Sequence, residues 1–323
     1  MSAGKLTVER LKKELALPVI CAPMFLISGP DLVVAACKAG IVGSFPLFNR
    51  RTTAELIVWF DEIVARLDEA RRADPTAYIA PWSANINTHT SNPRFAEDLE
   101  LIVRYRVPVV ISALGSPKRI VEPVHAYGGL VIADAASPAL ARKAADHGVD
   151  GLGLIASGSG GHTGSVSPFA FVREVRRWWD GAIVLGGAIG DAVGIRAAEV
   201  LGADLAYMGT RFIPTPESLA EPEHKRMIIE SGIDDLVISN ALTGATASWL
   251  RPSLISVGLD PKTLKPREDG YRYRGLLGDE PKPWKGIFSA GQGIGSIDRV
   301  ETVADIVGDL KRDYAKRYNG SGA

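Results

Sequence analysis

The sequence of 323 residues has few cysteines and no excess of charge of either sign. Its two cysteines, Cys21 and Cys37, cannot build a disulfide framework, and their apolar neighbours predict two buried thiols in a reducing compartment. The 37 Lys and Arg residues balance 37 Asp and Glu residues, so the composition favours neither a nucleic acid nor an anionic membrane as a partner. These absences predict a protein that works on small molecules.

Long apolar runs and clusters of metal ligands are missing as well. No segment approaches the ~20 consecutive apolar residues that span a bilayer. The N-terminal region mixes charged residues with single apolar ones, unlike a signal peptide, so we expect a soluble, cytoplasmic protein. No group of His, Cys and Asp has the spacing of metal ligands, so we expect no metal site.

Glycine, in contrast, is abundant, with 34 residues. Short apolar runs alternate with helical patterns between residues 18 and 212, and continuous apolar runs are typical of strands buried on both faces of a parallel sheet. The predicted strands are 19–24, 41–45, 78–85, 109–113, 130–134, 151–154, 183–186 and 205–209. This alternation predicts an α/β protein built as a (β/α)8 TIM barrel.

The main alternative is an open, doubly wound sheet. Such a sheet places G-x-G-x-x-G after its first strand, where this sequence has Ala22-Pro23-Met24-Phe25. Two later glycine-rich segments, 158–163 and 291–296, lack the final glycine of that motif, and no Walker A motif occurs. The glycine pattern therefore favours the barrel.

Proline and glycine mark the predicted helix boundaries. A small or polar residue followed by proline predicts helix starts at Gly29-Pro30, Asn92-Pro93, Ser116-Pro117, Ser137-Pro138 and Ser167-Pro168. Thr52 and Glu55 form a capping-box pattern, and Pro123 inside another helical pattern predicts a kink or a short helix. The glycines expected to end helices are Gly40, Gly128, Gly148 and Gly202.

The pattern changes after residue 212. Residues 213–290 are rich in proline and contain a helical pattern over 221–231, which predicts an inserted subdomain or lid after the eighth strand. We expect residues 1–212 and 291–318 to form the barrel, completed by a final helix. The apolar positions of that helix are Ile297, Val300, Val303, Ile306, Val307 and Leu310.

Glycines after the seventh and eighth strands predict an anion site. In a barrel, functional groups lie at the carboxyl ends of the strands, and phosphate groups bind at the loops after strands seven and eight. Those loops contain Gly186 and Gly187 in one case, and Gly209 and Thr210 in the other. Small residues expose backbone N–H groups, and the threonine adds a hydroxyl donor, so we expect a phosphorylated ligand.

A histidine follows the sixth strand inside a third glycine-rich loop. Gly160 and Gly161 precede His162, and glycines here let the backbone approach a ligand while the imidazole reaches inward. The other four histidines lack this setting. We expect His125 and His147 to cap helix ends, and we expect His89 and His224 to be exposed to solvent.

Several motifs occur in a characteristic order. They are Ala22-Pro23-Met24, Ala84-Asn85, Gly-Gly-His-Thr-Gly at 160–164, Gly186-Gly187, Met-Gly-Thr-Arg-Phe at 208–212 and Ala-Gly-Gln-Gly-Ile-Gly at 290–295. Together they resemble the FMN-dependent nitronate monooxygenases, formerly called 2-nitropropane dioxygenases. The resemblance covers most of the chain.

The resemblance implies an FMN cofactor, a small nitronate or nitroalkane substrate, and O2 as the oxidant of the reduced flavin. His162 matches the catalytic histidine of the family, which removes the proton next to the nitro group or contacts the nitronate. The products would be carbonyl compounds and nitrite. The cofactor-binding residues that the resemblance implies are Ala22, Pro23, Met24, Asn85, Gly160, Gly161, Gly186, Gly187, Gly209, Thr210, Gln292 and Gly293.

One position departs from the family, because many members carry Lys at the end of the fifth strand where this sequence has Asp134. The chain also resembles flavin-dependent enoyl-ACP reductases in the Gly-Gly-His loop and the Gly-Thr-Arg-Phe segment, and NAD(P)H-quinone reductases belong to the same superfamily. Both remain alternatives, with NAD(P)H as the reductant. A flavin-free isomerase or aldolase would need a Schiff-base Lys or paired carboxylates at strand ends, which this sequence lacks.

Neither the substrate nor the oligomeric state follows from the sequence, which is compatible with a homo-oligomer. The region after the eighth strand offers aromatic and basic residues without a readable pattern. They are Trp249, Arg251, Tyr271, Tyr273 and Trp284.

Overall fold

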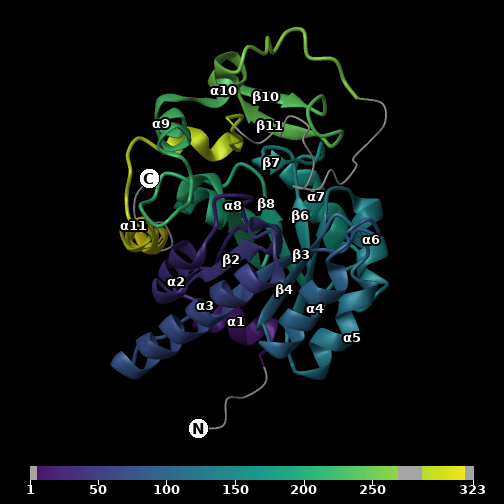
Figure 1. The fold of residues 1–323 in the computed structure, drawn as a ribbon, viewed down its shortest axis with the longest axis vertical. Helices are drawn as coiled ribbons and strands as arrows, with labels where there is room; N and C mark the ends of the chain where they lie inside the picture. Colours follow the sequence, from purple (N-terminus) through teal and green to yellow (C-terminus); the bar gives the residue numbers. More distant parts are fainter. Residues whose placement is uncertain (1–5, 268–285, 317–323) are drawn as a thin grey trace.

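The computed structural model describes residues 6–267 and 286–316. Eight parallel strands form a closed barrel, which confirms the predicted (β/α)8 fold and excludes the open sheet (Figure 1). In order around the barrel they are β1 (Val19–Cys21), β2 (Val42–Pro46), β3 (Trp82–Asn87), β4 (Val109–Ala113), β5 (Leu130–Ala135), β6 (Gly151–Ile155), β8 (Ala182–Gly186) and β9 (Leu205–Met208). The barrel closes where Ile20 of β1 pairs with Tyr207 of β9.

The predicted strands match the observed ones except at some ends. The largest difference is in the third strand, which begins at Trp82 rather than at residue 78. Pro81 precedes it and has no N–H group for a strand ladder, and Ala80 instead donates its N–H to the carbonyl of Cys37 at 2.9 Å. Residues 78–81 therefore belong to the loop that precedes β3.

Helices surround the barrel. They are α1 (Val8–Glu14), α2 (Pro30–Lys38), α3 (Thr53–Ala73), α4 (Phe95–Arg104), α5 (Lys118–Ala126), α6 (Pro138–Ala145), α7 (Pro168–Arg176), α8 (Ala192–Leu201) and α11 (Val303–Lys316). Three of the expected starts are confirmed with proline in the first turn, and the capping box at Thr52 and Glu55 forms as predicted. Helix α5 has nine residues and contains Pro123, in agreement with a short helix.

Two helices begin later than their Pro motifs predict. Asn92 donates its side-chain N–H to the carbonyl of Asn87 and accepts from the N–H of Arg94, so α4 begins only at Phe95. Ser116 accepts from the N–H of Lys118, the first residue of α5. Polar side chains that form local turns with the backbone compete with the helix at these two positions.

The helix-ending glycines occur where they were predicted. Gly202 caps α8 in the left-handed conformation with φ 108°, and Gly40, Gly128 and Gly148 also have positive φ. A residue with a Cβ atom adopts this conformation at a cost, which is why glycine is common there. These positions account for part of the high glycine content.

The core occupies both the barrel interior and the layer between strands and helices. Ile20, Ile111 and Val184 are fully buried inside the barrel. Cys21 and Cys37 are buried free thiols, as predicted, and burial raises the pKa of both, that of Cys37 to about 12. They have no catalytic character.

The chain after β9 forms a layer above the barrel in Figure 1. It contains α9 (Pro222–Glu230), β10 (Leu236–Ser239), β11 (Ala247–Leu250) and α10 (Arg251–Ser256). Strands β10 and β11 form a small antiparallel sheet with β7 (Gly161–His162), a strand in the loop after β6. This sheet joins the late segment directly to the histidine loop.

The final helix begins at Val303, later than predicted. Ile297 ends a 3-10 helix over Gln292–Ser296 in an extended conformation, and Val300 is exposed, so both precede α11. The hydroxyl of Thr302 accepts from the N–H of Asp305 and caps the new start.

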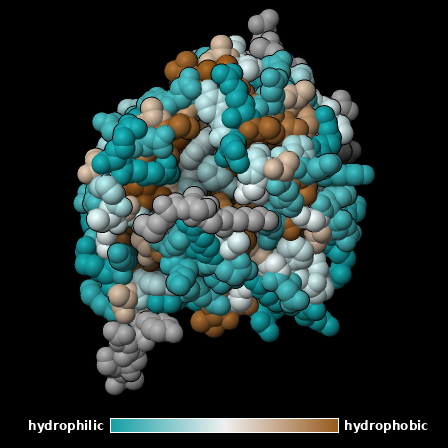
Figure 2. All heavy atoms as spheres, turned by 90° about the horizontal axis from the view of Figure 1, so that it is seen from below, coloured by the Kyte–Doolittle hydropathy of each residue, from teal (hydrophilic) through white to brown (hydrophobic). Residues whose placement is uncertain are grey.

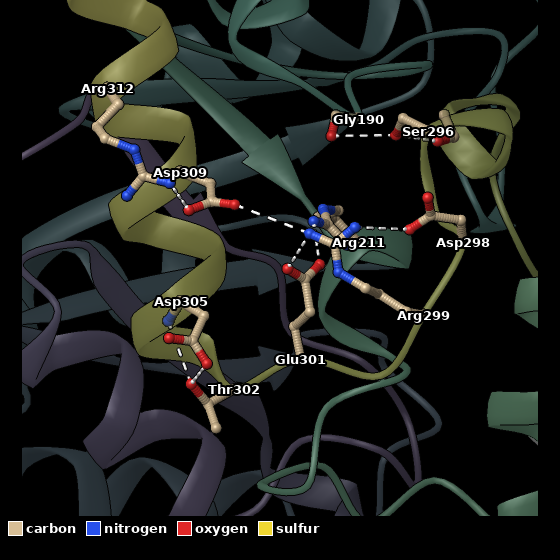
Figure 3. A network of polar contacts seen from close by, with 11 residues as sticks. Gly190, Arg211, Ser296, Asp298, Arg299, Glu301, Thr302, Asp305, Asp309 and Arg312 are labelled. Carbon is tan, nitrogen blue, oxygen red and sulfur yellow. Dashed lines mark hydrogen bonds and ion pairs between the residues drawn. The ribbon is translucent and has the colours of Figure 1, made fainter.

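A network of ion pairs holds this last segment against the barrel (Figure 3). Arg211, which follows β9, pairs with Glu301 at 2.6 Å, and Arg299 contacts the other oxygen of Glu301 at 2.7 Å. Asp309 of α11 pairs with Arg312 and lies 3.9 Å from Arg299. Arg211 and Glu301 are nearly buried, so this pair is part of the interior.

The surface at the end of the molecule opposite α9 and α10 is mainly hydrophilic (Figure 2). Figure 2 shows that hydrophilic side chains predominate there and that hydrophobic ones form separate patches. Within the described ranges, no helix combines the length and the apolar character needed to cross a membrane.

Candidate active site

A cavity of about 1980 Å³ lies at the carboxyl ends of the barrel strands. Loops that follow several strands line it, together with parts of the segment after β9. All but one of the predicted site residues lie in its lining: Ala22, Pro23, Met24, Asn85, Gly160, Gly161, His162, Gly186, Gly187, Gly209, Thr210 and Gly293. The exception is Gln292, which is exposed and donates its backbone N–H to Gly158 at 2.9 Å.

The ends of β8 and β9 form the part of the lining suited to an anion. Gly187 has φ 143°, and a Cβ atom there would lie only 2.7 Å from the carbonyl oxygen of Ser157. Thr210 accepts the N–H of Gly291 at 2.8 Å, so its own hydroxyl proton remains available for a ligand oxygen. In the first turn of α8, the N–H of Gly194 is donated to the side chain of Asp191, so this amide is not available to a ligand.

Three glycine-rich segments contact one another beside this site. The carbonyl of Gly158 accepts from the N–H groups of Ala188 (3.2 Å) and Gln292 (2.9 Å), which joins the loops after β6 and β8 to the late segment. A Cβ atom at Gly291 would lie 2.7 Å from that same carbonyl oxygen, and one at Gly160 would lie 2.8 Å from the nitrogen of Gly291. Only residues without a side chain allow this close approach.

His162 is held by the small sheet. Its backbone pairs with Ala247 of β11, and the next residue, Thr163, donates its N–H to Thr246 at 3.0 Å. The imidazole lies in the cavity lining, and burial lowers the pKa of His162 from 6.5. The ring is therefore neutral near pH 7 and able to accept a proton.

Asp134 and Tyr207 form a polar pair deep in the cavity. Tyr207 points from β9 across the barrel and donates its hydroxyl to Oδ1 of Asp134 at 3.2 Å. Asp134 lies deep in the protein but keeps some accessible surface, because it opens onto the cavity. Burial raises the pKa of Asp134 to about 7, and the hydrogen bond from Tyr207 opposes that rise.

His224 is buried, and the expectation that it is exposed to solvent is wrong. Its Nε2 lies 3.0 Å from the carbonyl oxygen of Ser289, and its ring stacks on Phe288 with 4.5 Å between the centroids. Burial lowers the pKa of His224 to about 4, and the residue belongs to the cavity lining. This contact could not be predicted from local patterns, because the partners of His224 follow α9 by more than 50 residues.

The remaining histidines have varied surroundings. His125 lies in the last turn of α5, near the helix end as expected, and its Nε2 also lies 2.8 Å from Asp150. His147 is in the cavity lining, and His89 contacts Ser91 in a loop that is outside this lining. Among the residues that the structure describes, no group of three or more His, Cys, Asp or Glu could hold a metal ion.

Asn49 is a positioning residue that sequence reasoning missed. It is buried, accepts the N–H of Leu26 at 2.8 Å, and donates to the carbonyls of Met24 and Ser28 at 3.1 and 2.7 Å. These bonds fix the loop after β1, where Leu26 has a positive φ of 61°. Leu114 and Ala188, also in the cavity lining, have positive φ as well, and strained backbone of this kind concentrates at functional sites.

Comparisons with known proteins agree with this geometry. A family model described as nitronate monooxygenase matches residues 9–313. The (3aS,4S,5R,7aS)-5-hydroxy-7a-methyl-1-oxo-octahydro-1H-indene-4-carboxyl-CoA dehydrogenase of Rhodococcus jostii is 22% identical, with 95% of each chain covered. The nitronate monooxygenase of Paraburkholderia phytofirmans is 25% identical, with 92% of each chain covered. The structure of FabK from Thermotoga maritima is similar with a TM-score of 0.76, 25% identity and 96% of each chain covered.

Proposed function

Because the chain belongs to the nitronate monooxygenase family and is a flavin-dependent oxidoreductase, we propose that it binds FMN and oxidises alkyl nitronates or nitroalkanes with O2 to carbonyl compounds and nitrite. The observation that carries the proposal is one cavity that contains both His162 and the glycine loops after β8 and β9. A neutral base and an anion cradle are the two elements that this reaction requires from the protein.

The residues of the cradle fit the phosphate of FMN. Gly186, Gly187 and Gly209 line the cavity without side chains that would shield the backbone, and the hydroxyl of Thr210 adds a donor. Pro23, Met24 and Asn85 line the same cavity and would contact the ring system. When bound, the flavin supplies the electron acceptor.

His162 would act as the general base. A ring nitrogen of the neutral imidazole takes the proton from the carbon next to the nitro group, and the low pKa of this histidine keeps the base unprotonated at neutral pH. The sheet of β7, β10 and β11 fixes the backbone of His162, and the loop between β10 and β11 contributes to the cavity lining.

The proposal is tested by product analysis. The purified protein, released from its cofactor by denaturation, should yield FMN in a one-to-one ratio to chain. With propyl-2-nitronate in air, it should consume O2 and form acetone and nitrite. A protein that holds no flavin after gentle purification with added FMN would contradict the proposal, as would flavoprotein that forms no nitrite.

The second candidate is an NAD(P)H-dependent flavin reductase. The cavity favours it, because about 1980 Å³ exceeds the roughly 300–1,000 Å³ of common ligand pockets and leaves room for a nicotinamide or an extended substrate beside a flavin. This candidate predicts that NADH or NADPH reduces the bound flavin rapidly. Slow reduction by both nucleotides would exclude it.

A further inference from the structure

Asp134 is a buried carboxyl that the proposed reaction does not use. It lies at the end of β5, at the inner part of the cavity lining, and Tyr207 is the hydrogen-bond partner that the described residues supply. Gly153 on the neighbouring strand leaves space for it, since a Cβ atom at Gly153 would collide with Oδ1 of Asp134. Three strands thus cooperate to hold one carboxyl group at the cavity surface.

The strands packed against Asp134 contribute no opposite charge. Its neighbours β4 and β6 contain no titratable residue, and β9 contributes the hydroxyl of Tyr207. His162 of β7 is neutral and lines the same cavity. Lys143 of the neighbouring helix α6 belongs to the same cavity lining, at an exposed position. The other titratable residues of the two nearest helices lie outside that lining: Lys118, Arg119, Glu122 and His125 of α5 and Arg142 of α6.

We propose that Asp134, held by Tyr207, is a proton-binding group of the cofactor cavity whose charge is coupled to flavin binding. The inference rests on the proposed function, because it assumes that a flavin occupies this cavity. A phosphate anion in the same cavity disfavours a carboxylate by repulsion, and a bound ring system disfavours it by excluding water. Cofactor binding therefore favours the carboxyl form of Asp134 over the carboxylate.

The coupling has a defined sign. Near pH 6 Asp134 is protonated before the flavin binds, so its ionisation does not oppose binding. Above the pKa of about 7, the free protein must take up one proton to bind the cofactor. The Kd for FMN then rises by about tenfold for each pH unit, until the pH exceeds the pKa of Asp134 in the complex.

The experiment measures the Kd for FMN between about pH 5.5 and about pH 9 on full-length protein stripped of flavin, by quenching of flavin fluorescence. The FMN phosphate titrates equally in every variant. The ratio of the wild-type Kd to that of Asp134→Asn therefore reports only the effect of the ionisation of Asp134 on FMN binding. We expect the ratio to be constant below pH 6.5 and to increase at least tenfold by about pH 8.5. Asp146→Asn removes an exposed carboxylate from the same cavity lining and should follow the wild type.

A second variant tests the role of Tyr207. The hydroxyl of Tyr207 stabilises the charged form of Asp134, so Tyr207→Phe should move the onset of the increase in Kd to higher pH. A Kd ratio that stays constant over the whole range, with FMN bound by both proteins, would overturn this inference and leave the proposed function intact. Failure of the wild type to bind FMN at any pH would overturn the proposed function itself.

Discussion

His162 shows how one residue type becomes reactive through its surroundings. It lies in a two-residue strand that pairs with β11, and burial lowers its pKa, so the imidazole is neutral where a free histidine begins to protonate. A neutral imidazole in a glycine-rich loop can approach a substrate closely and take a proton. The reactivity of this residue is thus set by a strand that comes 85 positions later in the sequence.

The variant His162→Asn should keep its flavin but turn over neutral nitroalkanes about 10² to 10⁴ times more slowly, the usual contribution of a general base. Oxidation of a preformed nitronate, which needs no proton removal, should change much less. In the wild type, kcat/KM for the neutral substrate should fall only below pH 6.5, because the pKa of His162 is lowered. His89→Asn, in a loop outside the cavity lining, is the control, and unchanged turnover by His162→Asn would refute the assignment of the base.

The buried carboxyl of Asp134 predicts how the free energy of unfolding changes with pH. Its pKa rises from 3.8 to about 7 on folding, so the folded protein binds this proton more tightly than the unfolded chain. Protonation of Asp134 therefore stabilises the folded state, fully below about pH 4, and this contribution is lost as the pH rises through about 7. Asp134→Asn should therefore stabilise the flavin-free protein by about 3 kcal/mol more at pH 8 than at pH 5, as measured by urea unfolding. An equal change in the free energy of unfolding at both pH values would contradict the claim that burial raises the pKa of Asp134.

At the scale of elements, the glycine loops after β6 and β8 and the segment before α11 depend on mutual contact. Gly291→Ala would place a methyl group 2.7 Å from the carbonyl oxygen of Gly158 and force these loops apart. We expect the Kd for FMN to increase at least tenfold, because the amide donors of the cradle move. A methyl group at Gly295, in the 3-10 helix that follows Gly291, would meet nothing within 4 Å, so Gly295→Ala should bind FMN like the wild type. An equal loss in both variants would contradict the contact between these loops.

The strands and the glycine cradle were predictable from the sequence because their signals are local. Continuous apolar runs marked the barrel strands, and residues at strand ends converge in a barrel whatever their distance along the chain. Local polar contacts shifted the starts of α4 and α5, and Thr302 moved the start of α11, since such contacts compete with the proline and apolar patterns. Helix α11 shows that apolar spacing alone does not set a boundary.

The burial of His224 and the strand at His162 could not be predicted in this way. Both depend on the chain after β9, whose proline-rich sequence has no clear period, and His224 is covered by Phe288 and Ser289. Trp249 is fully buried in the core of this region. Tyr271, Tyr273 and Trp284 lie outside the described residues, so the expectation about their role stays untested.

On the scale of the whole molecule, the ion pair of Arg211 and Glu301 joins the residues after β9 to the segment just before α11 (Figure 3). Glu301→Gln leaves a buried guanidinium without its countercharge, and breaking such a pair costs about 3 kcal/mol of unfolding free energy. The exposed pair of Arg226 and Glu223 offers a control, and Glu223→Gln should leave stability close to that of the wild type. Equal unfolding midpoints for the two variants would show that the network does not stabilise the fold.

The central claim is that the cavity oxidises nitronates through a bound flavin, and anaerobic mixing tests it most directly. The flavin absorbance of the purified protein is followed after addition of propyl-2-nitronate, NADH or NADPH in separate stopped-flow experiments. The proposed function predicts rapid bleaching by the nitronate and slow or no bleaching by either nucleotide. Rapid bleaching by NADH or NADPH, with none by the nitronate, would contradict it.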